Sequence, residues 1–164
     1  MLLYVPASFG DLDHVDSRGL WTVPAGQACA VTQRLSAALP DEGEEELEWQ
    51  AFVEASFLSL SAIAATPAAP PLRVIISVEV PDGLVAGMSS SSDDDAKDTS
   101  PAAVTIPAAI PQATVTAIHV DEPAAIADVQ AALTHPEDDA AIEDVLNRDM
   151  LWYLPQEIPA IPQG

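Results

Sequence analysis

The sequence predicts an α+β domain with two layers, in which a small mixed sheet of three or four strands packs against helices. Three observations favour this class. Of the 164 residues, 49% are hydrophobic, enough for the core of one domain spanning residues 1–164. Segments with strand periodicity and segments with helix periodicity both occur. They do not alternate strictly, so a degenerate ferredoxin-like core fits their order better than a parallel sheet.

The N-terminal segments predict one strand and two short helices. A strand is expected at residues 2–5, where apolar residues run up to a proline. We interpret residues 8–20 as a short helix. Residues 32–39 predict a second one, with Thr32 as the N-cap, because a hydroxyl there accepts a hydrogen bond from the first turn.

The longest helix is predicted over residues 42–65. Asp41 and Glu44 have the spacing of a capping box, and the glutamates that follow suit the positive end of the helix dipole. The second half of this segment is apolar nearly all round, which indicates burial. Phe52 and Leu58 are therefore expected to be core residues.

The second half of the chain predicts three strands and two helices. Residues 72–80 form the clearest strand, since a wholly apolar set alternates there with Arg73, Ile75, Ser77 and Glu79. Strands are also expected at residues 104–106 and 114–120. One helix should begin near Pro123 and another near Thr134.

Two further segments lack either periodicity. Residues 84–101 are rich in serine and aspartate, and we expect a disordered acidic loop because this segment has few apolar groups to offset its ordering entropy. Residues 155–164 carry three prolines, which predicts an extended tail.

The net charge of −21 restricts the classes of partner that this protein is expected to bind. An anionic surface repels nucleic-acid phosphates and anionic lipid, so we expect no nucleic-acid partner and no membrane. A basic protein partner would suit this charge. The acids concentrate at residues 41–54, 82–98 and 137–149, which belong to different elements. We expect them to be scattered, whereas one contiguous acidic face would favour partner binding.

Cysteine usage and the N-terminal residues predict a cytoplasmic location. Cys29 is the single cysteine, so no intrachain disulfide forms, as is typical of a reducing compartment. The first residues lack the basic segment of a signal peptide. Since Cys29 stands among alanines and a valine, it is interpreted as a buried structural thiol.

His119 and Asp121 are the candidate catalytic residues. They share one face of an expected strand and lie at its end, where sites of α/β proteins collect their ligands. A histidine there could act as a general base that a carboxylate orients. The alternative is that Asp121 caps the next helix and His119 packs at the sheet edge.

A C-terminal cluster supplies the candidate binding residues. It combines aromatic rings with an amide and a carboxylate, in Trp152, Tyr153, Gln156 and Glu157. Aromatic anchors are common in binding hot spots. The alternative is a C-terminal plug that docks on the core of the domain.

Motifs for metal or cofactor binding are missing from the sequence. The run at residues 11–16 contains three aspartates and His14, but its spacing does not match a calcium-binding EF-hand loop. Phosphate-binding glycine loops, zinc motifs and nucleophile elbows do not occur. We therefore expect no cofactor and no metal.

Several blocks of the chain, in order, resemble DUF6912, an actinobacterial family of small proteins of unknown function. The matching blocks are Tyr4 to Ala7, Ala30 to Thr32, the acidic start of the long helix, Arg73 to Asp82, Ala117 to Asp121, Leu151 to Tyr153 and Gln156 to Pro159. The resemblance implies a bacterial, cytosolic, single-domain protein. It implies no activity, so no residue inherits a role from it.

Two hypotheses of function follow from these observations. The first is a non-enzymatic domain with a binding or regulatory role that meets a protein partner, favoured by the acidic surface and the lack of catalytic motifs. The alternative is a small enzyme that uses His119 with Asp121, beside Tyr153 or Glu157. A pocket that gathers His119 and the segment 153–157 would favour the enzyme.

Overall fold

The structure, a computed structural model, describes residues 1–84 and 100–164. The acidic loop expected at residues 84–101 falls almost entirely outside the described residues. Its disorder therefore stays a prediction.

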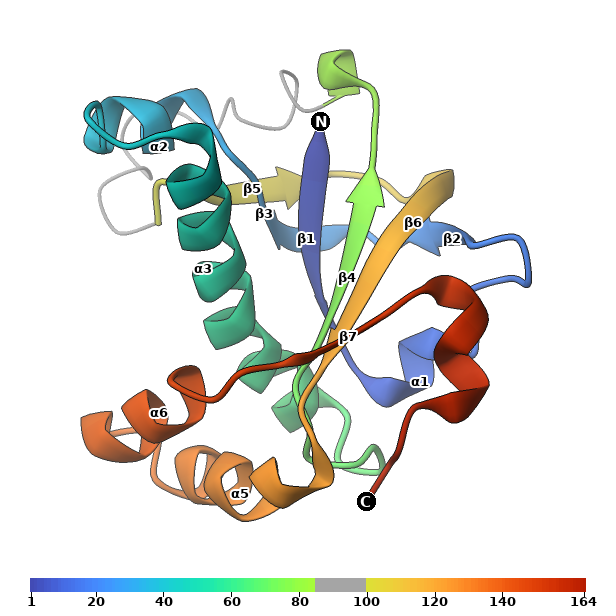
Figure 1. Cartoon of the computed structure of the whole chain (residues 1–164), viewed down its shortest axis with the longest axis vertical. Coiled ribbons are helices and arrows are strands. Elements are labelled where there is room, and N and C mark those ends of the chain that lie inside the picture. The colour runs from blue at the N-terminus through green and yellow to red at the C-terminus, as the bar shows by residue number, and fades with distance from the viewer. Residues whose placement is uncertain (85–99) are drawn as a thin grey trace.

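The described residues form one antiparallel sheet of seven strands packed with helices, so the α+β class is confirmed (Figure 1). The strands are β1 (Leu2–Ala7), β2 (Leu20–Val23), β3 (Gly26–Cys29), β4 (Val74–Glu79), β5 (Ala103–Ile106), β6 (Ile110–Val120) and β7 (Leu151–Tyr153). Six lie in the order β2-β6-β4-β1-β3-β5, and β7 pairs with β6. The predicted sheet of three or four strands was therefore too small, and the prediction of a mixed sheet was wrong, because all described pairings are antiparallel. The missed strands β2, β3 and β7 have three or four residues each, too few to display a strand period.

The strand order also differs from the ferredoxin-like core that we expected. In that fold, another strand separates the two strands that the first crossover helix joins. Here the chain passes from α3 (Glu44–Ala65) into β4, and β4 pairs directly with β1 in the antiparallel sense, from Leu2 opposite Glu79 to Ala7 opposite Val74.

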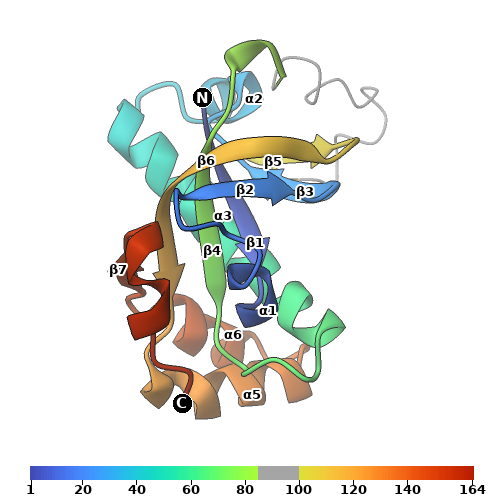
Figure 2. The same cartoon turned by 90° about the vertical axis from the view of Figure 1, so that its right-hand side faces the viewer.

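The long strand β6 curls the sheet. Its first half pairs with β2 and its second half pairs with β4 and β7. Figure 2 shows β2 and β3 running across β1 and β4 rather than along them. Bulges at Trp21–Val23 and Ser77–Val78 interrupt the register, and such bulges increase strand twist.

The two faces of the central strands are both buried but have different compositions. One face carries only aliphatic side chains in the main core, among them Leu3, Val5, Val74, Ile76, Val78, Ile118 and Val120. The opposite face lies against α3. It carries Tyr4 and Ile75 in a second, smaller cluster with Leu47 and Ala51 of the helix. The polar alternates of residues 72–80 lie on this second face, since side chains alternate along a strand.

Helix α3 begins two residues later than predicted. Its N-cap is Gly43, whose lack of a side chain leaves no capping hydrogen bond, so the capping box expected from Asp41 and Glu44 was wrong. The buried side of α3 comprises Leu47, Ala51, Ala55, Ser56, Ser59, Leu60 and Ile63. Phe52 and Leu58 are only partly buried, because they lie at the edge of this stripe.

The remaining helices are short. They are α1 (Phe9–Leu12), α2 (Gln33–Ala38), α5 (Ile126–Thr134), α6 (Asp139–Leu146) and the 3-10 helices η2 (Pro123–Ala125) and η3 (Pro155–Ala160). Thr32 caps α2 as predicted, since its side chain accepts a hydrogen bond from the Leu35 amide. The C-terminal segment is not fully extended: it forms η3, and Ile161 after it is buried in the main core.

Candidate functional site

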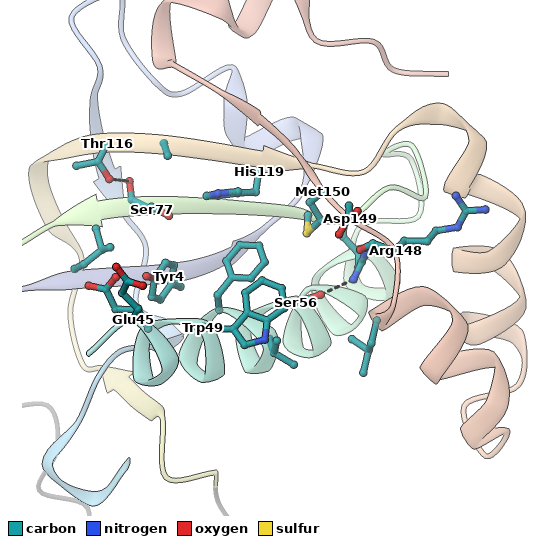
Figure 3. Close-up of a pocket in the computed structure, with 17 residues that line it drawn as sticks. Tyr4, Glu45, Trp49, Ser56, Ser77, Thr116, His119, Arg148, Asp149 and Met150 are labelled. Atoms are coloured by element: carbon teal, nitrogen blue, oxygen red, sulfur yellow. Dashed lines mark hydrogen bonds between the residues drawn. The ribbon is translucent and has the colours of Figure 1, made fainter. Parts of the chain in front are cut away.

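A cleft of about 500 Å³ lies between α3 and the sheet (Figure 3). Strands β1, β4 and β6 form its roof in this view and α3 its floor, and the segment between α6 and β7 closes one end. Its lining residues are Leu2, Tyr4, Glu45, Glu48, Trp49, Phe52, Val53, Ser56, Arg73, Ser77, Thr116, Ala117, His119, Leu146, Arg148, Asp149 and Met150.

Small side chains on the sheet leave room for the cleft. The register places Tyr4 opposite Ser77 and Ser77 opposite Ala117, so these three residues form one row across β1, β4 and β6. Directly paired residues project to the same face of a sheet. The side chains of Ser77 and Ala117 are too short to fill the distance to α3 here, and the remaining space is part of the cleft.

Aromatic rings divide the cleft near its middle. The ring of Phe52 lies edge-on to the rings of Tyr4 and His119, at centroid distances of 5.9 and 4.7 Å. Trp49 stacks on Phe52 at 5.7 Å and is 58% exposed, so much of the indole faces solvent. The middle of the cleft thus combines apolar surface with the edge of an imidazole.

A fully buried ion pair closes the end of the cleft near β7. The Arg73 guanidinium donates to both carboxylate oxygens of Asp121, from Nε at 2.8 Å and from Nη2 at 2.7 Å. It also donates to Ser56 Oγ on α3 and to the Arg148 carbonyl, at 3.2 Å for the latter. Both charged groups, the guanidinium and the carboxylate, therefore have the hydrogen-bond partners that a buried charge requires. Because Arg73 directly precedes β4 and Asp121 directly follows β6, the pair links these strand ends to α3 and to the segment before β7.

Two buried polar atoms in the cleft have no hydrogen-bond partner among the described residues: Ser77 Oγ and His119 Nδ1. Ser77 is 2% exposed. Burial without a counter-charge lowers the pKa of His119 to about 4, so the imidazole is neutral near pH 7. Buried polar atoms are nearly always paired, so each of these two atoms has a capacity for hydrogen bonding that the described residues leave unused.

Carboxylates surround the cleft. Glu45 and Glu48 come from α3, and Asp149 comes from the segment after α6; none of the three forms an ion pair within residues 1–84 and 100–164. Burial, with the Glu48 charge as a second cause, raises the pKa of Tyr4 to about 12. The cleft therefore has a negative potential, which favours a cationic ligand.

Two of the three acidic stretches of the chain supply these carboxylates. Residues 41–54 lie at the start of α3 and residues 137–149 include α6, and Figure 1 places them toward opposite ends of the helical layer. The third stretch lies mostly outside the described residues. Scattering of the acids remains a prediction, but both described stretches contribute carboxylates to the lining of the cleft.

His119 lines the cleft, whereas the structure gives Asp121 a different partner. Both carboxylate oxygens of Asp121 accept hydrogen bonds from Arg73, and His119 Nδ1 has no partner in the described part of the chain. The geometry therefore offers no carboxylate-oriented imidazole.

The four C-terminal candidates do not line the cleft. Trp152 is paired with His119 across the strands and is 57% exposed. Tyr153 packs against the main core on the other face. Glu157 accepts a hydrogen bond from the Leu154 amide at 2.7 Å, and Gln156 is exposed on η3. Only Trp152 thus lies beside the candidate site.

Five residues of this site were not predicted as site residues: Tyr4, Trp49, Ser56, Arg73 and Ser77. Arg73 and Ser77 carried a signal, because each is a polar residue within the predicted strand 72–80, whose other face is wholly apolar. Cys29 is buried as expected; burial, and less strongly the Glu54 charge, raises the pKa of its thiol to about 12.

Neither a metal centre nor a membrane span is found in the described chain. Residues 1–84 and 100–164 contain no cluster of three or more His, Cys, Asp or Glu side chains placed to hold a metal ion. Among the same residues, no helix combines the length and apolar character needed to cross a bilayer.

Comparison with known proteins identifies one family. The model of a family described as "Family of unknown function (DUF6912)" matches residues 1–161. No curated protein and no solved structure matches the chain.

Proposed function

We propose that this chain, which belongs to the DUF6912 family of unknown function, is a non-enzymatic domain that binds a basic protein partner at the cleft beside α3. One observation carries the proposal: Glu45, Glu48 and Asp149 line the cleft without a cationic partner among the described residues. Complementary charge steers a basic partner to such a surface and speeds its capture.

The aromatic surface at the cleft supports the same proposal. Trp49 lies on α3 between the two glutamates and Phe52 and is more than half exposed. Tryptophan is among the residues most enriched in interface hot spots. A protein partner could bury this ring while its own cations approach the carboxylates.

A small enzyme that uses His119 is the second candidate. In its favour, the imidazole lines the cleft and is neutral near pH 7. Against it, Asp121 is held by Arg73, and the segment 153–157 does not line the cleft. A partner-binding domain needs neither group, and we therefore favour it.

A cytoplasmic location is part of the proposal. Its support is Cys29, which is buried and carries a thiol of raised pKa, so it is protected from oxidation rather than available for pairing. A basic cytoplasmic protein is the partner class that we expect.

Binding of a basic model peptide tests the proposed function. We expect a flexible peptide with alternating lysine and glycine to bind the full chain at low salt and to lose affinity as salt screens the charges. The double variant Glu45→Gln/Glu48→Gln should bind about fivefold more weakly, as expected for two exposed charge contacts. Isothermal titration calorimetry measures both effects.

The matched control removes the same charge away from the cleft. Glu143 and Asp144 are exposed on α6 and do not line the cleft, so Glu143→Gln/Asp144→Asn should leave the affinity almost unchanged. Equal losses for the two double variants would mean that the peptide responds to net charge alone. That outcome would contradict a binding site at the cleft.

A further inference from the structure

We propose that the cleft binds a primary ammonium group, carried by a lysine side chain of the basic partner, between Trp49, the hydroxyl of Ser77 and the carboxylates of Glu45 and Glu48. This inference rests on the proposed function and names the chemical group that the cleft selects. Besides the acidic residues, it depends on the buried hydroxyl of Ser77, which lines the cleft and has no hydrogen-bond partner among the described residues.

The roof of the cleft offers one hydroxyl acceptor that the described part of the protein leaves unpaired. Ser77 Oγ is buried and has no partner among the described residues, and Tyr4 is the direct cross-strand neighbour of Ser77. The short side chain of Ala117 on the other side of Ser77 keeps this part of the row open. An alkylammonium group has three N–H donors, and hydroxyl and carboxylate oxygens are its natural acceptors.

The charges of the lining residues favour a cation. The cleft has two cationic side chains of its own, and both are engaged: Arg73 with Asp121, and Arg148 with Asp128 at 2.6 Å and Glu122 at 3.3 Å. The neighbouring imidazole of His119 carries no charge near pH 7. The three lining carboxylates, Glu45, Glu48 and Asp149, therefore have no cationic partner among the described residues. Glu45 lies at the same end of the cleft as Ser77 (Figure 3), and Glu48 follows Glu45 one turn along α3.

The apolar surface of the cleft suits the stem of a lysine. Trp49 and Phe52 stack at 5.7 Å and line the same cleft as Ser77, and Val53 adds aliphatic surface from the same helix. A lysine buries its methylene groups along apolar surface while its ammonium group makes polar contacts, and a cation near a Trp face gains further attraction.

This geometry should discriminate lysine from arginine and from trimethyllysine. The guanidinium group is a planar fork that matches bidentate carboxylate geometry, whereas Ser77 offers a single hydroxyl that a compact ammonium donor can use. A trimethylated ammonium group keeps its charge but has no N–H to donate to Ser77. Lysine should therefore bind best of the three.

The test uses three small probes: Nα-acetyl-lysine N-methylamide and its arginine and trimethyllysine counterparts. Each is titrated into the full chain and followed by 1H-15N NMR, including the indole N–H of Trp49. We expect the lysine probe to shift the cleft resonances and to bind at least about fivefold more tightly than the other two. Ser77→Ala should weaken lysine binding about tenfold, the usual loss for a hydrogen bond to a charged group.

Two further variants keep the test decisive. Ala117→Leu should fill the row and abolish binding of the lysine probe, with circular dichroism as the check on folding. Ser61 is exposed on α3 outside the cleft lining, and Ser61→Ala should leave binding unchanged. Equal affinities for the three probes, or full affinity in Ser77→Ala, would overturn the inference.

The outcome separates this inference from the proposed function. If the lysine–glycine peptide binds the cleft but the probes show no preference for lysine, the binding of a basic partner is supported and the ammonium site is contradicted. If the peptide does not bind the cleft either, both proposals fall.

Discussion

The two ends of the cleft differ in how their buried polar groups are paired. At one end, Arg73 has hydrogen-bond partners directly after β6, on α3 and on the segment before β7, and its side chain is 1% exposed. Toward the other end, Ser77 and His119 each hold a buried atom without a partner among the described residues. The first arrangement stabilises the fold, whereas the second leaves capacity for a ligand. A single face of the sheet therefore serves both purposes, with His119 one row and Ser77 two rows away from the ion pair.

The largest effect should come from breaking the paired end. Asp121→Asn leaves the Arg73 guanidinium buried without a counter-charge, and we expect the free energy of unfolding to fall by about 3–5 kcal/mol. Urea denaturation measures this loss. The control is Glu137→Gln, which removes an exposed carboxylate near His135 and should change the stability little. A loss below about 1 kcal/mol in Asp121→Asn would show that the pair does not hold these elements together.

The unpaired end should respond to acid. The pKa of His119 is about 4 in the folded chain against an ordinary 6.5, so the unfolded state binds the proton more tightly. The contribution of the neutral His119 imidazole to the free energy of unfolding is therefore fully present above pH 6.5. It is lost as the pH falls toward 4, by about 3 kcal/mol at most. The measurement is the difference in unfolding free energy between the wild type and His119→Gln from pH 7 to 4.

That difference isolates His119 from the other titrating groups. The charged and titratable groups that share its cleft are Tyr4, Glu45, Glu48, Arg73, Arg148 and Asp149, and they are present in both proteins. If the wild type and His119→Gln lose stability in parallel, His119 is not the group that titrates.

Two serine substitutions compare the ends directly. Ser56→Ala removes the acceptor of Arg73 Nη1 and should cost about 1–3 kcal/mol, because a buried charged donor is left unpaired. Ser77→Ala removes a hydroxyl without a described partner and should be neutral or slightly stabilising. Thermal unfolding of both variants checks the contrast. Equal losses would mean that Ser77 makes a contact on which the fold depends.

The smallest effect concerns salt. With a net charge of −21, self-repulsion should lower the melting temperature at low ionic strength, and added salt should raise it through screening. Glu45→Gln/Glu48→Gln should reduce this dependence, since it removes two exposed charges, whereas the buried Arg73–Asp121 pair should hardly be screened. A melting temperature that stays constant or falls with salt would contradict the repulsion.

The sequence predicted the long elements well because their periodicity is local. Helix α3 and strand β4 display their patterns over many residues, and both were found with small errors at their ends. Strands β2 and β3 were missed, because four residues show no period and their stability comes from pairing with β6 and β5, far along the chain. The curl of the sheet depends on that pairing and was not predictable from local signals.

The candidate site was predictable only in part. His119 was found because it lies near a strand end, but its supposed partner Asp121 pairs with Arg73, which lies 48 residues earlier. The neighbourhood of Tyr4 and Ser77 depends on the register of β1 against β4. A sequence pattern gives the face on which a residue lies, but not the residue opposite it.

The Arg73 contacts also bear on how the chain matures during synthesis. Its guanidinium gains a counter-charge only after Asp121 has been added, 48 residues later, and its last acceptor is the carbonyl of residue 148. At about 5–20 residues per second, β4 exists for about 2–10 s with an unpaired cation on the face that α3 must cover. The helix and the central strands therefore cannot close on the ribosome until the C-terminal third of the chain emerges. Truncated translation products should consequently remain open and be preferred substrates for proteases.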